Sequence, residues 1–393
     1  MNETTFNLRT LNLAAGTYSI TVQAEAEGYT DSDASNAVNY TAAAPIPTDC
    51  ILFAGETSDF TLKATNKSWD GTVEYSTDKN TWTTWDGSEI PSANKKLYLR
   101  GKNNTTFYSK KGAKFVLSAN AGCYGNINTL LDYENPPTTI DTTYCYREMF
   151  KNCTSLTSAP ELPATTLASG CYAQMFNGCT SLTSAPELPA TTLAQTCYDS
   201  MFNSCTSLTT APELPATTLS NHCYQYMFYG CTSLTTAPEL PATTLKDGCY
   251  NGMFNRCASL TTAPALPATT LESSCYCNMF LGCTSLTTAP VLPAATLKSI
   301  CYQSMFEGCT SLTTAPELPA TTLANYCYKN MFFKCTRLKI SATQTGEYTT
   351  AWRIPSAGEI AAEATNWNRD MLTNTGGTFT GNPSINTTYY GAW

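Results

Sequence analysis

The sequence predicts a mixed α/β solenoid, in which short parallel strands and short helices alternate along stacked repeats, preceded by small antiparallel β domains. A motif, C-Y-x-x-M-F-x-x-C-T-S-L-T-[ST]-A-P-E-L-P-A-T-T-L, begins eight times from Cys145 with a strict period of 26 residues, and the eighth copy departs from it after Leu338. Periods of about 20 to 50 residues are typical of repeat architectures. One unit cannot bury its apolar side alone, whereas stacked copies form a continuous core. The residues before Cys145 instead form short strand-like runs between turn residues.

Each repeat is expected to contain one helix of about two turns and one strand. In the first copy the apolar residues between Cys145 and Cys153 fall at i, i+1, i+4, i+5 and i+8, a spacing that covers one helical face. Pro160 lacks a backbone donor and should end strand pairing. We therefore expect parallel strands of three or four residues near 156–159 and at the equivalent places of the other repeats, ending with 338–341.

The repeats and their flanks divide the chain into four predicted segments. These are a partial fibronectin type III or immunoglobulin-like β module at 1–44, a small β domain at 45–121, the solenoid with its amino-terminal cap at 122–343, and a carboxy-terminal cap at 344–393. In the first segment Tyr18, Ile20 and Val22 alternate with polar residues, as in a half-buried strand. The segment resembles the last strands of such a module, which needs about seven strands. In the last segment we expect a helix over 356–374, followed by Gly376 and Gly377.

The repeat wording resembles the leucine-rich repeats of BspA-like bacterial surface proteins. The motif M-F-x-x-C-T-S-L-T-x-A-P-E-L-P-A-T-T-L, present almost letter for letter in eight copies, is similar to a branch common in gut Bacteroidales and their phages. The resemblance covers about half of the chain. It implies a leucine-rich-repeat solenoid, a surface or virion location and adhesion, and it brings no catalytic residues.

Charge and hydropathy exclude two classes of partner. The formal net charge is −8, which argues against binding to nucleic acid or to an anionic membrane surface. No apolar run approaches the roughly 20 residues that a membrane-spanning helix needs. Residues 1–4 lack the basic and apolar regions of a signal peptide. The expectation is a chain made for the cytoplasm, released inside a virion, or cut from a longer protein.

The sequence has nineteen cysteines, of which sixteen occupy two fixed positions of the repeat. These sixteen are expected to be free thiols. Cysteines eight residues apart on a helix lie about 12 Å apart, which is beyond the reach of a disulfide. Zinc sites require closely spaced pairs with further ligands nearby, and only Cys275 and Cys277 approach that spacing. We predict two buried columns of thiols, no metal and no cofactor.

No catalytic constellation is evident. His222 is the only histidine, and it lies in a connector between repeats. One position of the repeat should form a column of carboxylates, and it is occupied by Glu161, Glu187, Glu213, Glu239 and Glu317. Ala265 and Val291 interrupt this column. It suits calcium or a solvated ridge, and the sequence leaves both open. The chain is therefore predicted not to be an enzyme; a glycan-active enzyme would need two acids and aromatic residues in one cleft.

Variation between the repeats is concentrated on one side of the unit. Tyr226, Tyr229, Tyr326 and His222 occur at variable positions, and aromatic residues supply contact energy at small entropic cost. We take them as a candidate recognition surface. The predicted function is non-enzymatic attachment by a phage virion component, a fibre or decoration protein, that binds a host cell-surface protein or glycan.

Two other functions stay open, a bacterial cell-surface adhesin and a structural spacer without a specific ligand. Other virion or surface proteins are expected to bind through the amino-terminal module. Homo-oligomer formation is left open, and neither nucleic-acid binding nor membrane insertion is expected. The expected location is the virion, with the bacterial surface or extracellular space as the alternative.

Overall fold

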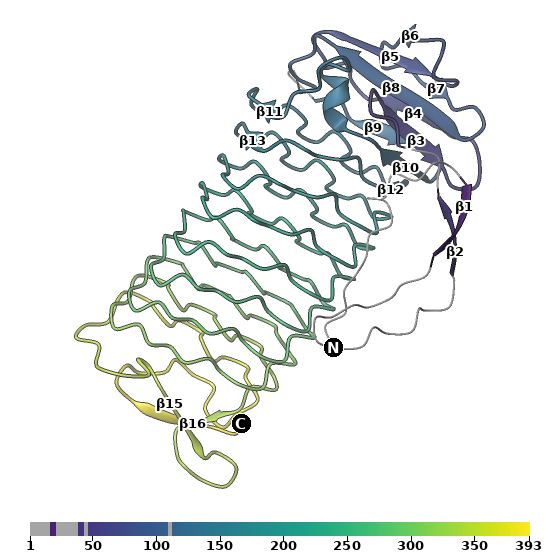
Figure 1. Cartoon of the computed structure of the whole chain (residues 1–393). Coiled ribbons are helices and arrows are strands. Elements are labelled where there is room, and N and C mark those ends of the chain that lie inside the picture. Colours follow the sequence, from purple (N-terminus) through teal and green to yellow (C-terminus); the bar gives the residue numbers. More distant parts are fainter. Residues whose placement is uncertain (1–15, 21–37, 43–45, 109–111) are drawn as a thin grey trace, which may run out of the picture. The chain divides into compact units, whose positions relative to one another are not determined.

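The computed structural model describes residues 16–20, 38–42, 46–108 and 112–393, the first two segments by their backbone (Figure 1). The chain divides into two compact units, Met1–Pro47 and Thr48–Trp393. In the first unit β1 (Gly16–Ile20) pairs antiparallel with β2 (Val38–Ala42). The fibronectin type III or immunoglobulin-like interpretation of this unit stays a prediction.

The second unit begins with two β-sheets. A six-stranded sheet has the order β12-β10-β3-β8-β5-β6, and a three-stranded sheet has the order β7-β4-β9. The strands are β3 (Ile51–Gly55), β4 (Thr61–Ala64), β5 (Thr72–Ser76), β6 (Thr83–Thr84), β7 (Ile90–Pro91), β8 (Lys96–Lys102), β9 (Phe115–Leu117), β10 (Ala121–Tyr124) and β12 (Leu156–Ser158). All neighbours pair antiparallel except β10 and β12, which pair parallel. Because β12 belongs to the first repeat, the larger sheet joins the β region to the repeats.

The aromatic core is also continuous across this junction. Phe107 stacks on Tyr146 of the first repeat with ring centroids 5.9 Å apart, and Phe115 meets Phe150 edge to face at 5.7 Å. A short 3-10 helix, η2 (Ile127–Leu130), is buried beside them. The β region therefore covers the open end of the first repeat, which would otherwise expose apolar side chains to water.

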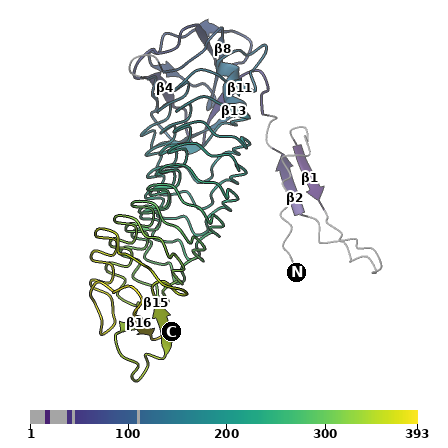
Figure 2. The ribbon, with the colours of Figure 1, turned by 90° about the vertical axis from the view of Figure 1, so that its left-hand side faces the viewer.

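The repeats are successive coils that lie side by side (Figures 1 and 2). Alternate N–H groups bond to the next coil: that of Tyr172 donates to the Cys197 carbonyl at 3.0 Å, and that of Phe176 donates to the Met201 carbonyl at 3.0 Å. The intervening N–H groups bond three residues back within their own coil, as Met175 does to Tyr172 at 3.1 Å. The backbone of this segment is thereby satisfied without a regular helix or strand.

The core consists of parallel columns of identical side chains. The repeat tyrosines stack with centroids 5.7 to 6.0 Å apart and the repeat phenylalanines at 5.5 to 5.8 Å, with nearly parallel rings. The two cysteine positions and the methionine position are buried in every repeat. The expectation that these residues point inward is confirmed.

The predicted fold class, a mixed α/β solenoid, is wrong, because the described residues contain no α-helix. Where a helix was expected, each repeat forms consecutive turns with positive φ at every fourth residue, as at Gly170 (62°), Gln174 (57°) and Gly178 (77°). Residues with positive φ cannot continue a right-handed helix. The apolar spacing of i, i+1, i+4, i+5 and i+8 has a period of four, which matches these turns better than the 3.6 of a helix.

The predicted row of eight parallel strands is also wrong. Among the described residues, strands occur at these places only in the first repeat, as β12, and at the end, where β14 (Ile340–Ser341) pairs antiparallel. Between them one column has isolated parallel bridges, the first joining Ser184 to Thr210 and the last joining Thr288 to Thr314. A proline follows each of these positions two residues later and removes the donor that a longer ladder needs. One further short parallel pair joins β11 (Thr139–Ile140) to β13 (Thr166–Leu167).

The helix expected at 356–374 is replaced by one more coil. The N–H of Phe332 in the last repeat donates to the Met371 carbonyl at 3.0 Å, as it would to the methionine of a further repeat. Asn366 and Asp370 repeat the positive φ at the expected spacing. The last sheet has the order β14-β16-β15, in which β15 is Thr350–Arg353 and β16 is Thr388–Gly391.

Candidate recognition surface

The turns that bury the core also fix a row of outward side chains. In C-Y-x-x-M-F-x-x-C the pairs after Tyr and after Phe, together with the residue before the first Cys, are mostly part-buried or exposed. We call the surface that they form the turn face. Three of its positions have positive φ in every repeat; around Cys223 these are His222 (55°), Tyr226 (51°) and Gly230 (69°). Because the backbone is held on both sides by neighbouring coils, the direction of these side chains is set before any ligand binds.

Three of the four predicted recognition residues come together on the fourth repeat. The rings of Tyr226 and Tyr229 are perpendicular, with centroids 6.0 Å apart, and His222 lies one turn earlier. All three are half-buried. Tyr226 lies across Gly252 of the next repeat and His222 lies across Gly248, so that a Cβ at either glycine would collide with the ring above it. Tyr226 and His222 therefore pack against the backbone of the following coil at these two glycines.

Charged residues of the neighbouring repeats surround this pair. Burial raises the pKa of Asp199 to about 6, against the hydrogen bond from Ser200 and the charges of Arg147 and His222. On the other side the Arg256 guanidinium lies over the Tyr229 ring, 5.6 Å from its centroid. Such a contact stabilises both groups. The cluster thus offers an aromatic pair between a carboxyl group and a cation.

Tyr326 is not part of this cluster. It lies four repeats after His222 in the same column. Lys329 lies over its ring at 5.5 Å, and its hydroxyl accepts from Asn366 Nδ2 at 3.5 Å. The structure therefore separates the four predicted residues into a cluster of three and one residue near the end of the stack.

Sequence reasoning missed Asp199 and Arg256. Both occupy variable positions of the repeat, so variability was the signal that could have found them. Contacts between residues of different repeats decide which variable residues meet. Those contacts depend on the path of the backbone. The helix that we expected in each repeat would have pointed these side chains in other directions.

No site for metal chemistry is found in the part of the chain that the structure describes, where no three His, Cys, Asp or Glu residues could hold a metal ion. The five glutamates of the predicted column are all exposed. Their exposure fits the solvated ridge, one of the two alternatives that the sequence left open. None of the helices described is long and apolar enough to cross a membrane.

Comparison with known families identifies the repeats. A family model described as the BspA type leucine rich repeat region (6 copies) matches residues 137–287 and 223–350, together more than half of the chain. The chain belongs to the BspA-type leucine-rich-repeat family. No curated protein and no solved structure matches it. The resemblance of the repeats to BspA-like proteins is thus confirmed.

The cysteines of these BspA-type repeats are buried thiols. The second cysteine of a repeat donates its S–H to the phenylalanine carbonyl of the preceding repeat, as Cys205 does to Phe176 at 3.1 Å and Cys257 to Phe228 at 3.0 Å. Burial raises the pKa of Cys205 and of Cys257 to about 12. Because the thiolate is the reactive form, these groups are protected against oxidation and alkylation at neutral pH.

We expect all nineteen cysteines to be reduced in the native protein and not to react with thiol reagents. Titration with a chromogenic disulfide reagent at pH 8 should release almost no signal from the folded chain. The same titration in denaturant without reductant should count about nineteen thiols, since every one is free and buried. A parallel sample that was fully reduced beforehand supplies the reference count. A count well below that reference would contradict the expectation.

Proposed function

We propose that this chain is a non-enzymatic attachment protein that recognises a protein or glycan on a host cell through its turn face. Its membership of the BspA-type family is consistent with a surface or adhesion protein. The observation that carries the proposal is the cluster of Tyr226, Tyr229, Asp199 and Arg256. Aromatic residues held rigidly beside a carboxyl group and a cation combine contact area with polar specificity.

The proposed location is a phage virion, where the chain would act as a fibre or decoration component of the branch found in gut Bacteroidales and their phages. A core of nineteen unpaired thiols supports synthesis in a reducing cytoplasm. The amino-terminal unit, proposed as a fibronectin type III or immunoglobulin-like module, would tether the chain to other virion proteins. Genomic neighbours that encode tail and capsid proteins would support this location, and neighbours that encode secretion proteins would favour a bacterial surface instead.

Binding of the fluorescent full chain to candidate host cells tests the attachment function. We expect saturable binding by the unmodified chain and at least a tenfold weaker affinity for Tyr226→Ala and for Tyr229→Ala, because each substitution removes half of the aromatic pair. Tyr326→Ala is the matched control, since this tyrosine lies outside the cluster. Equal affinity of all four proteins would remove the turn face from the proposal.

A structural spacer is the second candidate, and one observation favours it. On the turn face a bulky residue of one coil lies over a glycine of the next, as Tyr226 does over Gly252. Packing between coils therefore explains part of the variation without a ligand. A spacer would show no saturable binding to any host cell. The same assay therefore separates the two functions.

A further inference from the structure

A second surface of the stack lies along the P-x-L-P segments, which we call the proline ridge. Its variable residue is exposed in every repeat from 161 to 317. It is glutamate in five repeats, but Ala265 and Val291 replace it in two consecutive ones. Val291 is 79% exposed and is the most exposed large apolar side chain of the described residues. The carboxylate column thus has an apolar gap two repeats wide.

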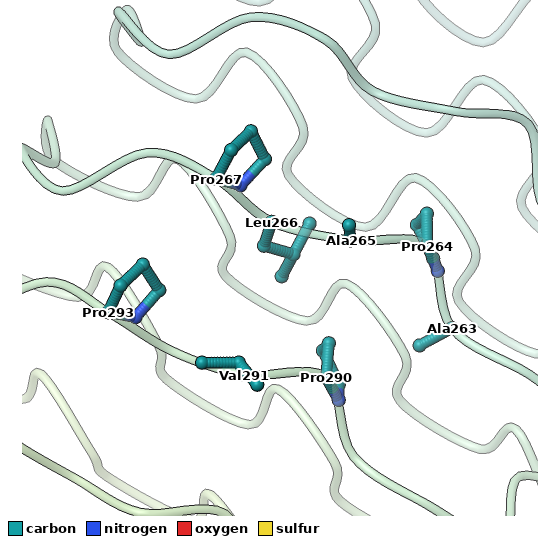
Figure 3. A pocket seen from close by; sticks show the side chains of 8 residues that line it. All are labelled: Ala263, Pro264, Ala265, Leu266, Pro267, Pro290, Val291 and Pro293. Carbon is teal, nitrogen blue, oxygen red and sulfur yellow. The ribbon is translucent and has the colours of Figure 1, made fainter.

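The gap coincides with a hollow in the surface. A space of about 270 Å³ lies between residues 263–267 of one repeat and 290–293 of the next (Figure 3). Two prolines from each repeat line it, and they are Pro264, Pro267, Pro290 and Pro293. A second hollow of about 350 Å³ shares Pro264 and Pro267 and reaches Glu239. Together the two hollows form an apolar surface that ends at a carboxylate.

The walls of this surface are held from both ends. Thr262 bridges to Thr288 on one side of the gap, and Thr270 bridges to Thr296 on the other. Between these bridges the prolines fix φ. The hollow is therefore formed in advance, and a partner would not have to order it.

Charge on both sides of the gap indicates what it would accept. Glu239 precedes the gap by one repeat and Glu317 follows it by one repeat, and both are exposed. Three repeat spacings separate them, on the order of 15 Å if neighbouring coils lie about 4.8 Å apart. An extended chain advances about 3.3 Å per residue, so about five residues would span the distance. A cation at each end and an apolar group at the centre complement this pattern.

We propose that the proline ridge docks an extended segment of a partner protein, with one aromatic side chain in the hollow and a lysine or arginine on each side of it. The aromatic ring would pack against the proline rings, in the way that proline-rich segments and aromatic residues recognise each other. The flanking cations would pair with Glu239 and Glu317. This docking is independent of the turn face, so either proposal can fail alone.

Fluorescence anisotropy with labelled peptides and the full chain tests the charge and aromatic requirements. The probe is Gly-Lys-Lys-Trp-Lys-Lys-Gly, compared with peptides in which serines replace the lysines or alanine replaces the tryptophan. We expect the probe to bind with one site per chain and at least tenfold more tightly than either comparison peptide. Equal binding of the serine peptide, or no binding of the probe, would overturn the proposal.

Two variants locate the site. The double substitution Ala265→Glu with Val291→Glu restores the column, and it should weaken probe binding at least tenfold; the fold tolerates glutamate at this position in five repeats. Thr232→Glu adds a carboxylate at an exposed residue outside the hollow and should leave the affinity unchanged. Unchanged binding by the double variant would overturn the proposal. So would a concentration-dependent dimer that this variant abolishes, since a second copy would then occupy the ridge.

A third variant tests whether the apolar gap in the glutamate column is sufficient for docking. Glu187→Ala with Glu213→Val copies the gap into the second and third repeats, between Glu161 and Glu239. In the Ala265→Glu/Val291→Glu background, where only one gap can use Glu239, these two substitutions should restore the binding of one peptide per chain. If binding is not restored, the glutamate column and its gap do not define the site.

Discussion

Replacing Phe254 by alanine is expected to lower the free energy of unfolding by about 3–5 kcal/mol. This side chain is fully buried in the central part of the stack. Its ring lies 5.7 Å from that of Phe228 and 5.8 Å from that of Phe280. Alanine would leave a cavity in a close-packed column, and the identical neighbours have no spare volume with which to fill it. Urea unfolding followed by tryptophan fluorescence measures the loss.

Thr261→Ala in the same repeat is the control. Thr261 is exposed, and substitutions at such sites usually change stability by less than about 0.5 kcal/mol. If Phe254→Ala lost no more than this control, the stacked column would not be the main source of cohesion between the repeats. A transition that splits into two would show instead that the cavity divides the stack into separately unfolding halves.

Replacing Gly252 by valine is expected to cost about 3 kcal/mol or more. Gly252 has a φ of 61°, where an L-residue loses roughly 1–2 kcal/mol and a β-branched residue is strongly disfavoured. A Cβ at this position would also collide with the Tyr226 ring. Thermal and urea unfolding of the variant measure the combined cost.

Two further variants separate the cost of the positive φ from the cost of the collision with Tyr226. Gly308 has a φ of 72° and no side chain near its hypothetical Cβ, so Gly308→Val should show the conformational cost alone. Adding Tyr226→Ala to Gly252→Val should recover the difference between the two valine variants. If Gly252→Val and Gly308→Val lowered the free energy of unfolding equally, the Tyr226 ring would move aside without cost. The absence of a Cβ at Gly252 would then not be what positions this ring.

The repeat period and the inward residues were open to sequence reasoning because each depends on residue type at a fixed spacing. The local backbone was not. Cys145, Met149 and Cys153 are spaced by four, which a helix accepts nearly as well as the observed turns. The deciding property is positive φ at Glu148 and Asn152. The residue types at these positions do not indicate a positive φ, as a glycine would. The same ambiguity produced the wrong helix at 356–374.

The turn face was only partly predictable for a related reason. Tyr226, Tyr229 and His222 could be chosen as variable residues. The contacts of Tyr226 with Gly252 and of His222 with Gly248, however, join residues 26 positions apart. A bulky residue followed by glycine one period later was visible in the sequence. It became informative only once the coils were known to lie in register, with alternate N–H groups bonded to carbonyl groups of the next coil.

That register restricts how the chain can be shortened during evolution. In a gene with such similar repeats, unequal recombination removes one whole period. Loss of residues 248–273 would place Ser274 beneath His222 and Asn278 beneath Tyr226, where the present chain has glycines without a Cβ. Loss of the period after it would leave both glycines in place. A chain that lost the fifth repeat would thus place a Cβ beneath each of the two rings, whereas a chain that lost the sixth would keep both glycines.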